Sequence, residues 1–335
     1  MYWKDKVILV TGGTGSFGKK FIELILKEYQ PAKVIVYSRD ELKQHEMRVA
    51  GFDHPDLRYF IGDIRDRDRL QRALNGVHFV VHAAALKQVP ACEYNPMEAI
   101  KTNILGSSNV IDAALDAGVE RVIALSTDKA VNPVNLYGAT KLAAEKLFVQ
   151  SNFYAAGTST RFSCVRYGNV VGSRGSVVPV FLKQRQTGTV TITDDRMTRF
   201  WISLEQGARF VIRCLEQMQG GEVFVPKIPS MRVIDLATTI APEAKVNIVG
   251  IRPGEKLHEA LISEDEARTT VELDDMYVVQ PAEAHWFGRA WERQGKSLPD
   301  GFRYVSDTNP DWMTIKQIQQ MVAPFEEAFE QGKEL

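Results

Sequence analysis

The chain has 335 residues, of which 44% are hydrophobic and 25% charged, and its formal net charge is -1. This is the composition of an ordinary globular protein, and it lacks the strong positive charge typical of nucleic-acid or membrane-surface binding. No apolar run approaches the roughly 18 residues of a membrane span. The three cysteines, Cys92, Cys164 and Cys214, match no metal spacing, and the N-terminus resembles no signal peptide. We therefore expect free thiols in a cytoplasmic protein.

Apolar runs rich in Val and Ile alternate with helical patterns over the first half of the chain. Strands are expected at residues 6–11, 33–38, 57–62, 77–83, 121–126 and 161–167. Helices are expected at 17–29, 65–74, 94–117 and 136–153. Strands that are apolar on both faces and separated by helices predict an α/β fold, a Rossmann-type doubly wound parallel sheet.

The alternation loosens after residue 170. Short strands are expected at 189–192, 221–225 and 245–249, and helices at 204–218 and 232–240. This pattern predicts a smaller mixed α/β lobe. We expect residues 1–170 to form the first domain and 171–335 mainly the second lobe, with later segments returning to the first.

A glycine-rich turn follows the first strand and opens the first helix. Its glycines are Gly12, Gly15 and Gly18, in the spacing G-x-x-G-x-x-G. Glycines allow a tight turn and a close approach of the backbone to a pyrophosphate, which the helix N-terminus then attracts. The turn predicts a dinucleotide site, whose contacts also include Thr14, Ser16 and Phe17.

The end of the second strand indicates which dinucleotide is bound. Arg39 and Lys43 are suited to a 2′-phosphate, with Ser38 donating a hydrogen bond, so NADP is favoured over NAD. Asp40 either contacts the cofactor or begins a helix as its N-cap.

Two further strand ends have residues suited to the same cofactor. Asp63 and Ile64 follow the third strand, where an adenine ring would lie. Ala83 and Ala84 follow the fourth and are small enough to pass beneath a ribose. A strand-end polar residue and small core packing are the alternatives for these two pairs.

Residues 126–141 contain two polar sets. Tyr137 and Lys141 are four apart at the start of a helix, hence on one face, and an ammonium there lowers the pKa of the phenol. Such a tyrosine accepts a hydroxyl proton as hydride leaves the same carbon. Both residues are also expected to contact the cofactor, Lys141 at the nicotinamide ribose. Thr127, Asp128 and Lys129 form the second set, for which a polar strand-end loop is the alternative.

These motifs resemble the extended short-chain dehydrogenases/reductases, in the branch of nucleotide-sugar dehydratases and epimerases. The similarity is greatest to inverting UDP-N-acetylglucosamine 4,6-dehydratases of pseudaminic acid biosynthesis. It rests on residues 11–18, 38–43, 82–87, 126–141, 166–176, 197–201 and 251–258. The resemblance implies tightly held NADP, UDP-N-acetylglucosamine as substrate, no metal, no nucleic-acid or membrane partner, and a homo-oligomer, dimer or hexamer.

That chemistry needs one base at C4 and an acid–base pair at C5 and C6. Tyr137 fits the C4 base and Thr127 a hydrogen bond to the C4 oxygen. Asp128 fits the acid, with a raised pKa, and Lys129 the C5 base, with a lowered pKa.

Related retaining dehydratases have glutamate where this chain has Lys129, but Lys129 alone does not settle the stereochemistry at C5. A retaining dehydratase and a UDP-sugar 4-epimerase remain alternatives, as does a non-catalytic NADP sensor. A 4-epimerase has no use for a C5 base, and a sensor needs neither polar set.

Substrate contacts come from later segments. Arg252, beside a Gly turn, suits a pyrophosphate. By resemblance Asn169, Arg174, Arg199 and Glu255 join it, and Lys87 matches a contact of the substrate loop. A salt-bridge partner is the alternative for Arg199, a helix-terminal charge for Glu255 and a turn residue for Asn169. His82, in an apolar strand, is interpreted as a core histidine.

Overall fold

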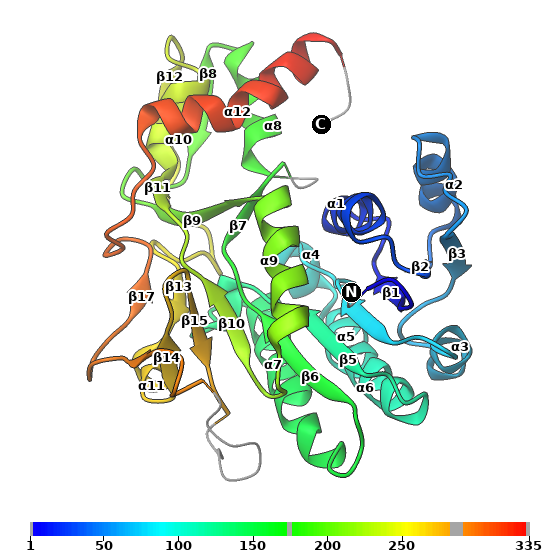
Figure 1. The fold of residues 1–335 in the computed structure, drawn as a ribbon. Helices are drawn as coiled ribbons and strands as arrows, with labels where there is room; N and C mark the ends of the chain where they lie inside the picture. The colour runs from blue at the N-terminus through cyan, green and yellow to red at the C-terminus, as the bar shows by residue number, and fades with distance from the viewer. Residues whose placement is uncertain (1–2, 173–175, 282–290, 333–335) are drawn as a thin grey trace.

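A ten-stranded sheet forms the centre of the molecule (Figure 1). The computed structural model describes residues 3–172, 176–281 and 291–332. The strands lie in the order β16-β14-β15-β10-β6-β5-β4-β1-β2-β3. Their bounds are β1 Val7–Thr11, β2 Lys33–Ser38, β3 Leu57–Ile61, β4 Phe79–His82, β5 Arg121–Leu125, β6 Arg161–Val165, β10 Val223–Pro226, β14 Thr270–Glu272, β15 Met276–Val279 and β16 Lys296–Ser297.

The part of the sheet from β3 to β10 is parallel throughout, and β15, β14 and β16 add an antiparallel edge. The predicted doubly wound α/β sheet is therefore confirmed. The chain runs outward from β1 to β3 and then returns to β4 on the other side of β1. Loops after β1 and β4 diverge at this switch point, which opens a crevice at the carboxyl ends of the strands.

Helices cover both faces of this sheet. Their bounds are α1 Ser16–Leu24, α2 Glu41–Val49, α3 Arg67–Ala73, α4 Val89–Tyr94, α5 Pro96–Ile100, α6 Gly106–Asp116, α7 Leu136–Tyr154 and α9 Leu204–Gln217, with the π-helical turns η1 Ile25–Tyr29 and η2 Lys101–Leu105. Figure 1 shows α1 and α9 on one face, where they pack together, and α6 and α7 on the opposite face.

The single helix expected at 94–117 is wrong at its start. The structure has a separate α4, then Asn95 in a non-helical conformation, and a new helix from Pro96. Proline lacks an N–H and disfavours the helical conformation of the residue before it, so it begins a helix rather than continuing one.

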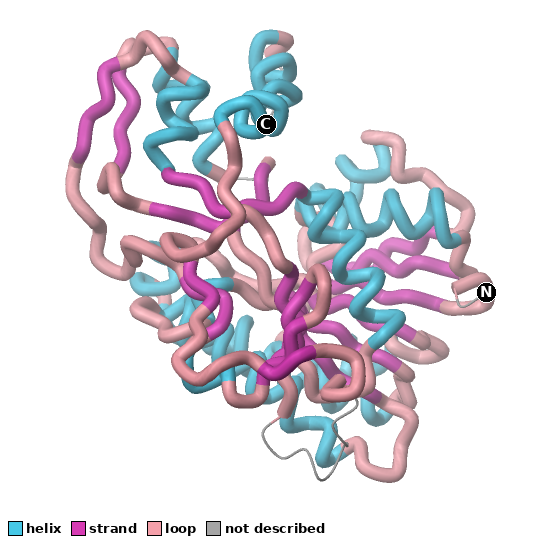
Figure 2. Tube along the Cα trace, turned by 60° about the vertical axis from the view of Figure 1, so that its left-hand side comes forward, coloured by secondary structure: helices cyan, strands magenta, loops and turns pink. Residues whose placement is uncertain are grey.

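A smaller lobe lies at one end of the sheet (Figure 2). It contains the three-stranded sheet β11-β9-β7 and the pair β12-β8, and the pair β13-β17 lies beside the large sheet. The bounds are β7 Asn169–Val171, α8 Val177–Arg185, β8 Thr189–Ile192, β9 Thr198–Ser203, β11 Ser230–Arg232, α10 Val233–Ile240, β12 Lys245–Ile248, β13 Ala260–Ile262, α11 Glu264–Ala267, β17 Tyr304–Val305 and α12 Ile315–Glu330. The lobe has its own apolar cluster, in which α8, α10 and α12 pack together.

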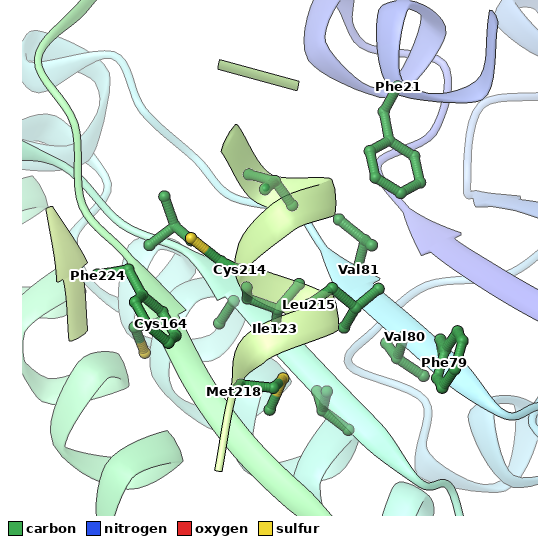
Figure 3. Packing of buried hydrophobic residues seen from close by; sticks show 14 of the residues in the cluster. Phe21, Phe79, Val80, Val81, Ile123, Cys164, Cys214, Leu215, Met218 and Phe224 are labelled. Atoms are coloured by element: carbon green, nitrogen blue, oxygen red, sulfur yellow. The ribbon is translucent and has the colours of Figure 1, made fainter. Parts of the chain in front are cut away.

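The main core lies between the sheet and its helices. In Figure 3, Cys214 and Leu215 of α9, and Met218 just after it, lie over the strands that contain Ile123 and Phe224. All three cysteines are buried and free, as predicted. Within the described part of the chain, no helix is long and apolar enough to cross a bilayer.

Candidate active site

The glycine turn lies between β1 and α1. Gly12 has a φ of 65°, a left-handed conformation that favours glycine, and a Cβ there would lie 2.9 Å from the backbone N and Cα of Ala84. A Cβ at Gly18 would lie 2.6 Å from the backbone of Gly13. No side chain within the described residues caps α1 at Gly15. The turn therefore fits a dinucleotide, because its backbone can approach a pyrophosphate at a helix N-terminus.

A cleft of about 810 Å³ extends from this turn across the carboxyl ends of the strands. Every residue proposed from sequence for cofactor contact lines it: Gly12, Thr14, Gly15, Ser16, Phe17, Gly18, Ser38, Arg39, Asp40, Lys43, Asp63, Ile64, Ala83, Ala84, Tyr137 and Lys141. The catalytic candidates Thr127, Asp128 and Lys129 line the same cleft. Tertiary folding therefore gathers the predicted residues into one place.

Two cations flank the end of β2. Arg39 is half exposed, with Nη1 3.6 Å from Asp63 Oδ2, and Lys43 Nζ lies 3.1 Å from Asp40 Oδ2. Asp40 caps α2, because its Oδ1 accepts a hydrogen bond of 3.0 Å from the Lys43 N–H. The N-cap interpretation of Asp40 is therefore confirmed. Because the Asp40 carboxylate caps α2, the groups at this strand end that can bind a cofactor are the cations of Arg39 and Lys43, which suit a 2′-phosphate.

His82 supports the alanine loop from within the core. It is buried, its Nδ1 lies 2.8 Å from Thr11 Oγ1, and burial lowers its pKa to about 3. Thr11 Oγ1 in turn accepts hydrogen bonds from the N–H groups of Ala83 and Ala84. His82 is thus a neutral, hydrogen-bonded core histidine, as predicted, which holds the loop beneath the proposed ribose site.

The reactive set is assembled from two neighbouring segments. Asp128 and Lys129 lie in the 3-10 turn η3 (Asp128–Ala130) after β5, and Tyr137 lies in the first turn of α7. Asp128 is 1% exposed and its Oδ1 accepts hydrogen bonds from Thr127 Oγ1 at 2.7 Å and Lys129 Nζ at 3.1 Å. Its Oδ2 is buried without a hydrogen-bond partner in the described residues. That oxygen is available to a ligand in the cleft.

The expected electrostatic role of Lys141 is wrong in this structure. Its Nζ donates a 2.6 Å hydrogen bond to the Leu125 carbonyl, and burial lowers its pKa. Burial is also the largest influence on Tyr137, whose pKa is raised to about 12. The ammonium that opposes this rise is that of Lys129. The cation that favours phenolate thus comes from η3, because the Lys141 ammonium is directed to the β5 main chain.

The expected direction of the Lys129 shift is also wrong. Burial by itself would lower its pKa, but the carboxylates of Asp128 and Glu259 outweigh burial and raise it. Glu259 Oε1 lies 3.4 Å from Lys129 Nζ, and the Glu259 side chain is 3% exposed. Sequence reasoning missed Glu259, whose sole local signal is a charge immediately before the buried strand β13.

The proposed substrate residues fall into three groups. Lys87 and Asn169 line the cleft, and the Asn169 Oδ1 is buried with no hydrogen-bond partner in the described chain. Arg199 and the Arg252–Glu255 turn are not among the lining residues. Arg174 lies outside the described residues.

Hydrogen bonds explain why Arg199 and the Arg252–Glu255 turn lie outside the cleft lining. Arg199 donates to the carbonyls of Lys256 and Leu257, so it ties β9 to the loop before β13. Glu255 Oε2 accepts a 3.3 Å hydrogen bond from the Arg252 N–H and closes its own turn.

Known proteins resemble this chain in sequence and in fold. The polysaccharide biosynthesis protein family matches residues 8–281. The inverting UDP-N-acetylglucosamine 4,6-dehydratase of Campylobacter jejuni subsp. jejuni serotype O:2 is 54% identical over 328 residues, 96% of this chain and 98% of its own length. Pen from Bacillus thuringiensis, solved by X-ray crystallography, superposes with a TM-score of 0.89 at 37% identity, covering 97% of this chain and 99% of Pen.

A more distant structure is DesIV from Streptomyces venezuelae, a dTDP-glucose 4,6-dehydratase solved with NAD and TYD bound. It superposes with a TM-score of 0.68 at 25% identity, over 75% of this chain and 86% of DesIV. The family match spans most of the chain, and the relatives carry the fold that the motifs resemble. The chain therefore belongs to the polysaccharide biosynthesis protein family and has the fold of the extended short-chain dehydrogenases/reductases.

Proposed function

We propose that this protein is an NADP-dependent UDP-N-acetylglucosamine 4,6-dehydratase that inverts the configuration at C5. The observation that carries the proposal is the placement of Asp128 and Lys129 beside Tyr137 in the cleft that contains the glycine turn. A simple alcohol dehydrogenase has no use for the additional acid–base pair. The 54% identical relative of the same description supports the substrate and the stereochemistry.

When bound, the nicotinamide cofactor supplies hydride acceptance at C4 and hydride return at C6. Tyr137, as the phenolate that the nearby Lys129 ammonium favours, takes the proton of the C4 hydroxyl and becomes the neutral phenol. Thr127 Oγ1 is hydrogen-bonded to Asp128, and we assign it a contact to the C4 oxygen. Lys141 is anchored on the Leu125 carbonyl and holds α7 beside β5.

The second half of the reaction removes water. The C4 ketone acidifies the C5 proton, which Lys129 accepts once its amine is neutral. Asp128 in its acid form protonates the departing C6 hydroxyl, so that one water leaves and a C5–C6 double bond forms. Once hydride has returned to C6, a proton added to C5 on the face opposite the one that lost its proton would invert that centre.

The specific cofactor and the assembly are part of this proposal. Arg39 and Lys43 at the end of β2 support NADP, because guanidinium and ammonium groups bind a phosphate strongly. We also propose a homo-oligomer, as the resemblance implies, with α6 and α7 on one face of the sheet as the candidate interface.

Proton NMR of the product in deuterated water tests the function. We expect a C6 methyl group, deuterium at C5, and a C5 coupling pattern that reports inversion. An intact C6 hydroxyl without exchange at C5 would refute the proposal and favour a 4-epimerase. A C5 coupling pattern of retention would refute inversion alone.

The variant Lys129→Ala tests the assigned base. We expect it to retain the cofactor and to lose deuterium incorporation at C5, because no amine then remains beside the proposed substrate site. Undiminished exchange would remove Lys129 from the reaction.

A further inference from the structure

A buried cluster of charges lies against Lys129 on the protein side of the cleft. Glu259 is its centre: Oε1 lies 3.4 Å from Lys129 Nζ, Oε2 lies 3.6 Å from Lys256 Nζ, and Oε1 lies 3.9 Å from Arg199 Nε. Sequence motifs placed neither Glu259 nor Lys256 in the site. The cluster therefore joins η3 to the loop before β13, segments about 130 positions apart in the chain.

Glu259 is incompletely paired, in contrast to the buried charges that serve the fold. Arg166 donates two hydrogen bonds to Glu145, at 3.0 and 2.6 Å, and others to Glu266. Glu259 Oε2 is buried and has no hydrogen-bond partner in the part of the chain that the structure describes. A buried carboxylate oxygen without a hydrogen bond is costly, so Glu259 contributes less to stability than the fully hydrogen-bonded Glu145.

The contacts of Lys129 show what Glu259 does. Asp128 is its neighbour in sequence and therefore moves with it. Glu259 is the anion that reaches Lys129 from another segment, so it restrains Nζ of a side chain that is 26% exposed. The groups that face Lys129 are Asp128 from η3, Tyr137 from α7, Arg199 from β9 and Glu259 from the loop before β13. Lys256 reaches the cluster through Glu259.

We propose that Glu259 is a positioning residue for the dehydration step, which acts through Lys129 by holding its Nζ beside Asp128 and controlling its charge. This inference rests on the proposed function, because it matters only if Lys129 is the C5 base. Arg199 Nε and Lys256 Nζ lie 3.9 and 3.6 Å from the Glu259 carboxylate and fix its place beside Lys129.

The direction of the effect follows from the charges. Lys129 accepts a proton only when neutral, so deuterium incorporation at C5 rises as the pH passes the pKa of Lys129. Glu259→Gln removes an anion and eases deprotonation, so this rise moves to lower pH, by about one to three pH units. Lys256→Met removes a cation, so the rise moves to higher pH.

The experiment measures C5 deuterium incorporation from UDP-N-acetylglucosamine against pH for wild type, Glu259→Gln and Lys256→Met. The matched control is Glu222→Gln, the same change at a buried carboxylate that accepts hydrogen bonds from Ser163 and Trp291. We expect its midpoint to equal that of wild type even if its stability falls. A purely structural role would lower rates without moving a midpoint.

A Glu259→Gln midpoint equal to that of wild type overturns the inference. If that variant fails to fold, the partly exposed Lys256 serves instead, and an unmoved Lys256→Met midpoint has the same meaning. A wild-type protein that forms no 6-methyl product refutes the proposed function itself. Normal wild-type product with unmoved midpoints refutes the role of Glu259 alone.

Discussion

Gly138 lies in the first turn of α7, where the helix meets the loop that carries Lys129. Its N–H donates a 2.8 Å hydrogen bond to Oδ1 of the N-cap Asn135. A Cβ at Gly138 would collide with the Lys129 carbonyl oxygen and lie 3.1 Å from both the Lys129 carbonyl carbon and Pro133 Cβ. We therefore predict that Gly138→Ala opens the contact between α7 and η3 and separates Tyr137 from Lys129.

Two opposing effects decide the magnitude. Replacing glycine with alanine inside a helix contributes about 0.5–1 kcal/mol of stability. Forcing a methyl group into a packed contact costs about 1–3 kcal/mol, which is the larger effect. The net loss is about 1 kcal/mol. Restoring a normal contact displaces the loop by about 1 Å, and such a displacement of reacting groups lowers kcat about 100-fold.

Urea unfolding and turnover of UDP-N-acetylglucosamine measure the two consequences. The matched control is Gly207→Ala in α9, where the nearest atom to a new Cβ is Ile202 Cδ1 at 4.0 Å. We expect the control to be about 0.5–1 kcal/mol more stable than wild type and fully active. If Gly138→Ala matches the control in both measurements, the close contact has no role in holding the site.

Two other predictions concern the cofactor and acid stability. We expect Arg39→Ala to weaken NADP binding about 10- to 100-fold, the value of a hydrogen bond to a charged group, and to leave NAD binding unchanged. Titration calorimetry measures both affinities, with Arg48→Ala in the last turn of α2 as the control. Equal losses of affinity for the two cofactors would contradict a 2′-phosphate site. The pKa of His82 is about 3 in the folded protein and 6.5 ordinarily. The unfolded chain therefore takes up the His82 proton at higher pH than the folded protein does. As a result, the free energy of unfolding falls as the pH drops from 6.5 towards 3. In His82→Gln, urea midpoints should lose that part of the pH dependence, and an identical slope in both proteins would refute a neutral buried His82.

Local patterns predicted the parallel sheet well. The expected strands at 33–38 and 189–192 coincide with β2 and β8, because β2 contains a continuous apolar run and β8 alternates polar with apolar residues. The strands β7 and β11 were missed, since three residues are too few to show periodicity. The antiparallel edge β14-β15-β16 was missed as well: β14 pairs with β15 in a tight hairpin, where Glu272 lies opposite Tyr277, but β14 and β16 are too short to show periodicity.

The reactive residues themselves could be predicted from sequence. The spacing of Tyr137 and Lys141 places both on one face of a helix, and the fifth strand delivers Asp128 and Lys129 to the same edge. Their protonation could not be predicted, because a pKa depends on every charge and every desolvated atom nearby. Lys129 is the clearest instance, since Glu259 reverses the shift expected from burial.

The sequence by itself determined the α/β class, the glycine turn and the identity of the cleft's reactive side chains, because these depend on residue type and short-range spacing. Only the tertiary structure decided which ammonium acts on Tyr137, that Asp40 is engaged as a helix cap, and that Arg199 faces Glu259. Such choices depend on distances of 3–4 Å between segments far apart in the chain. The interaction energy of two charges falls with the distance between them and rises with their burial. The distance and the burial are set only when the chain has folded.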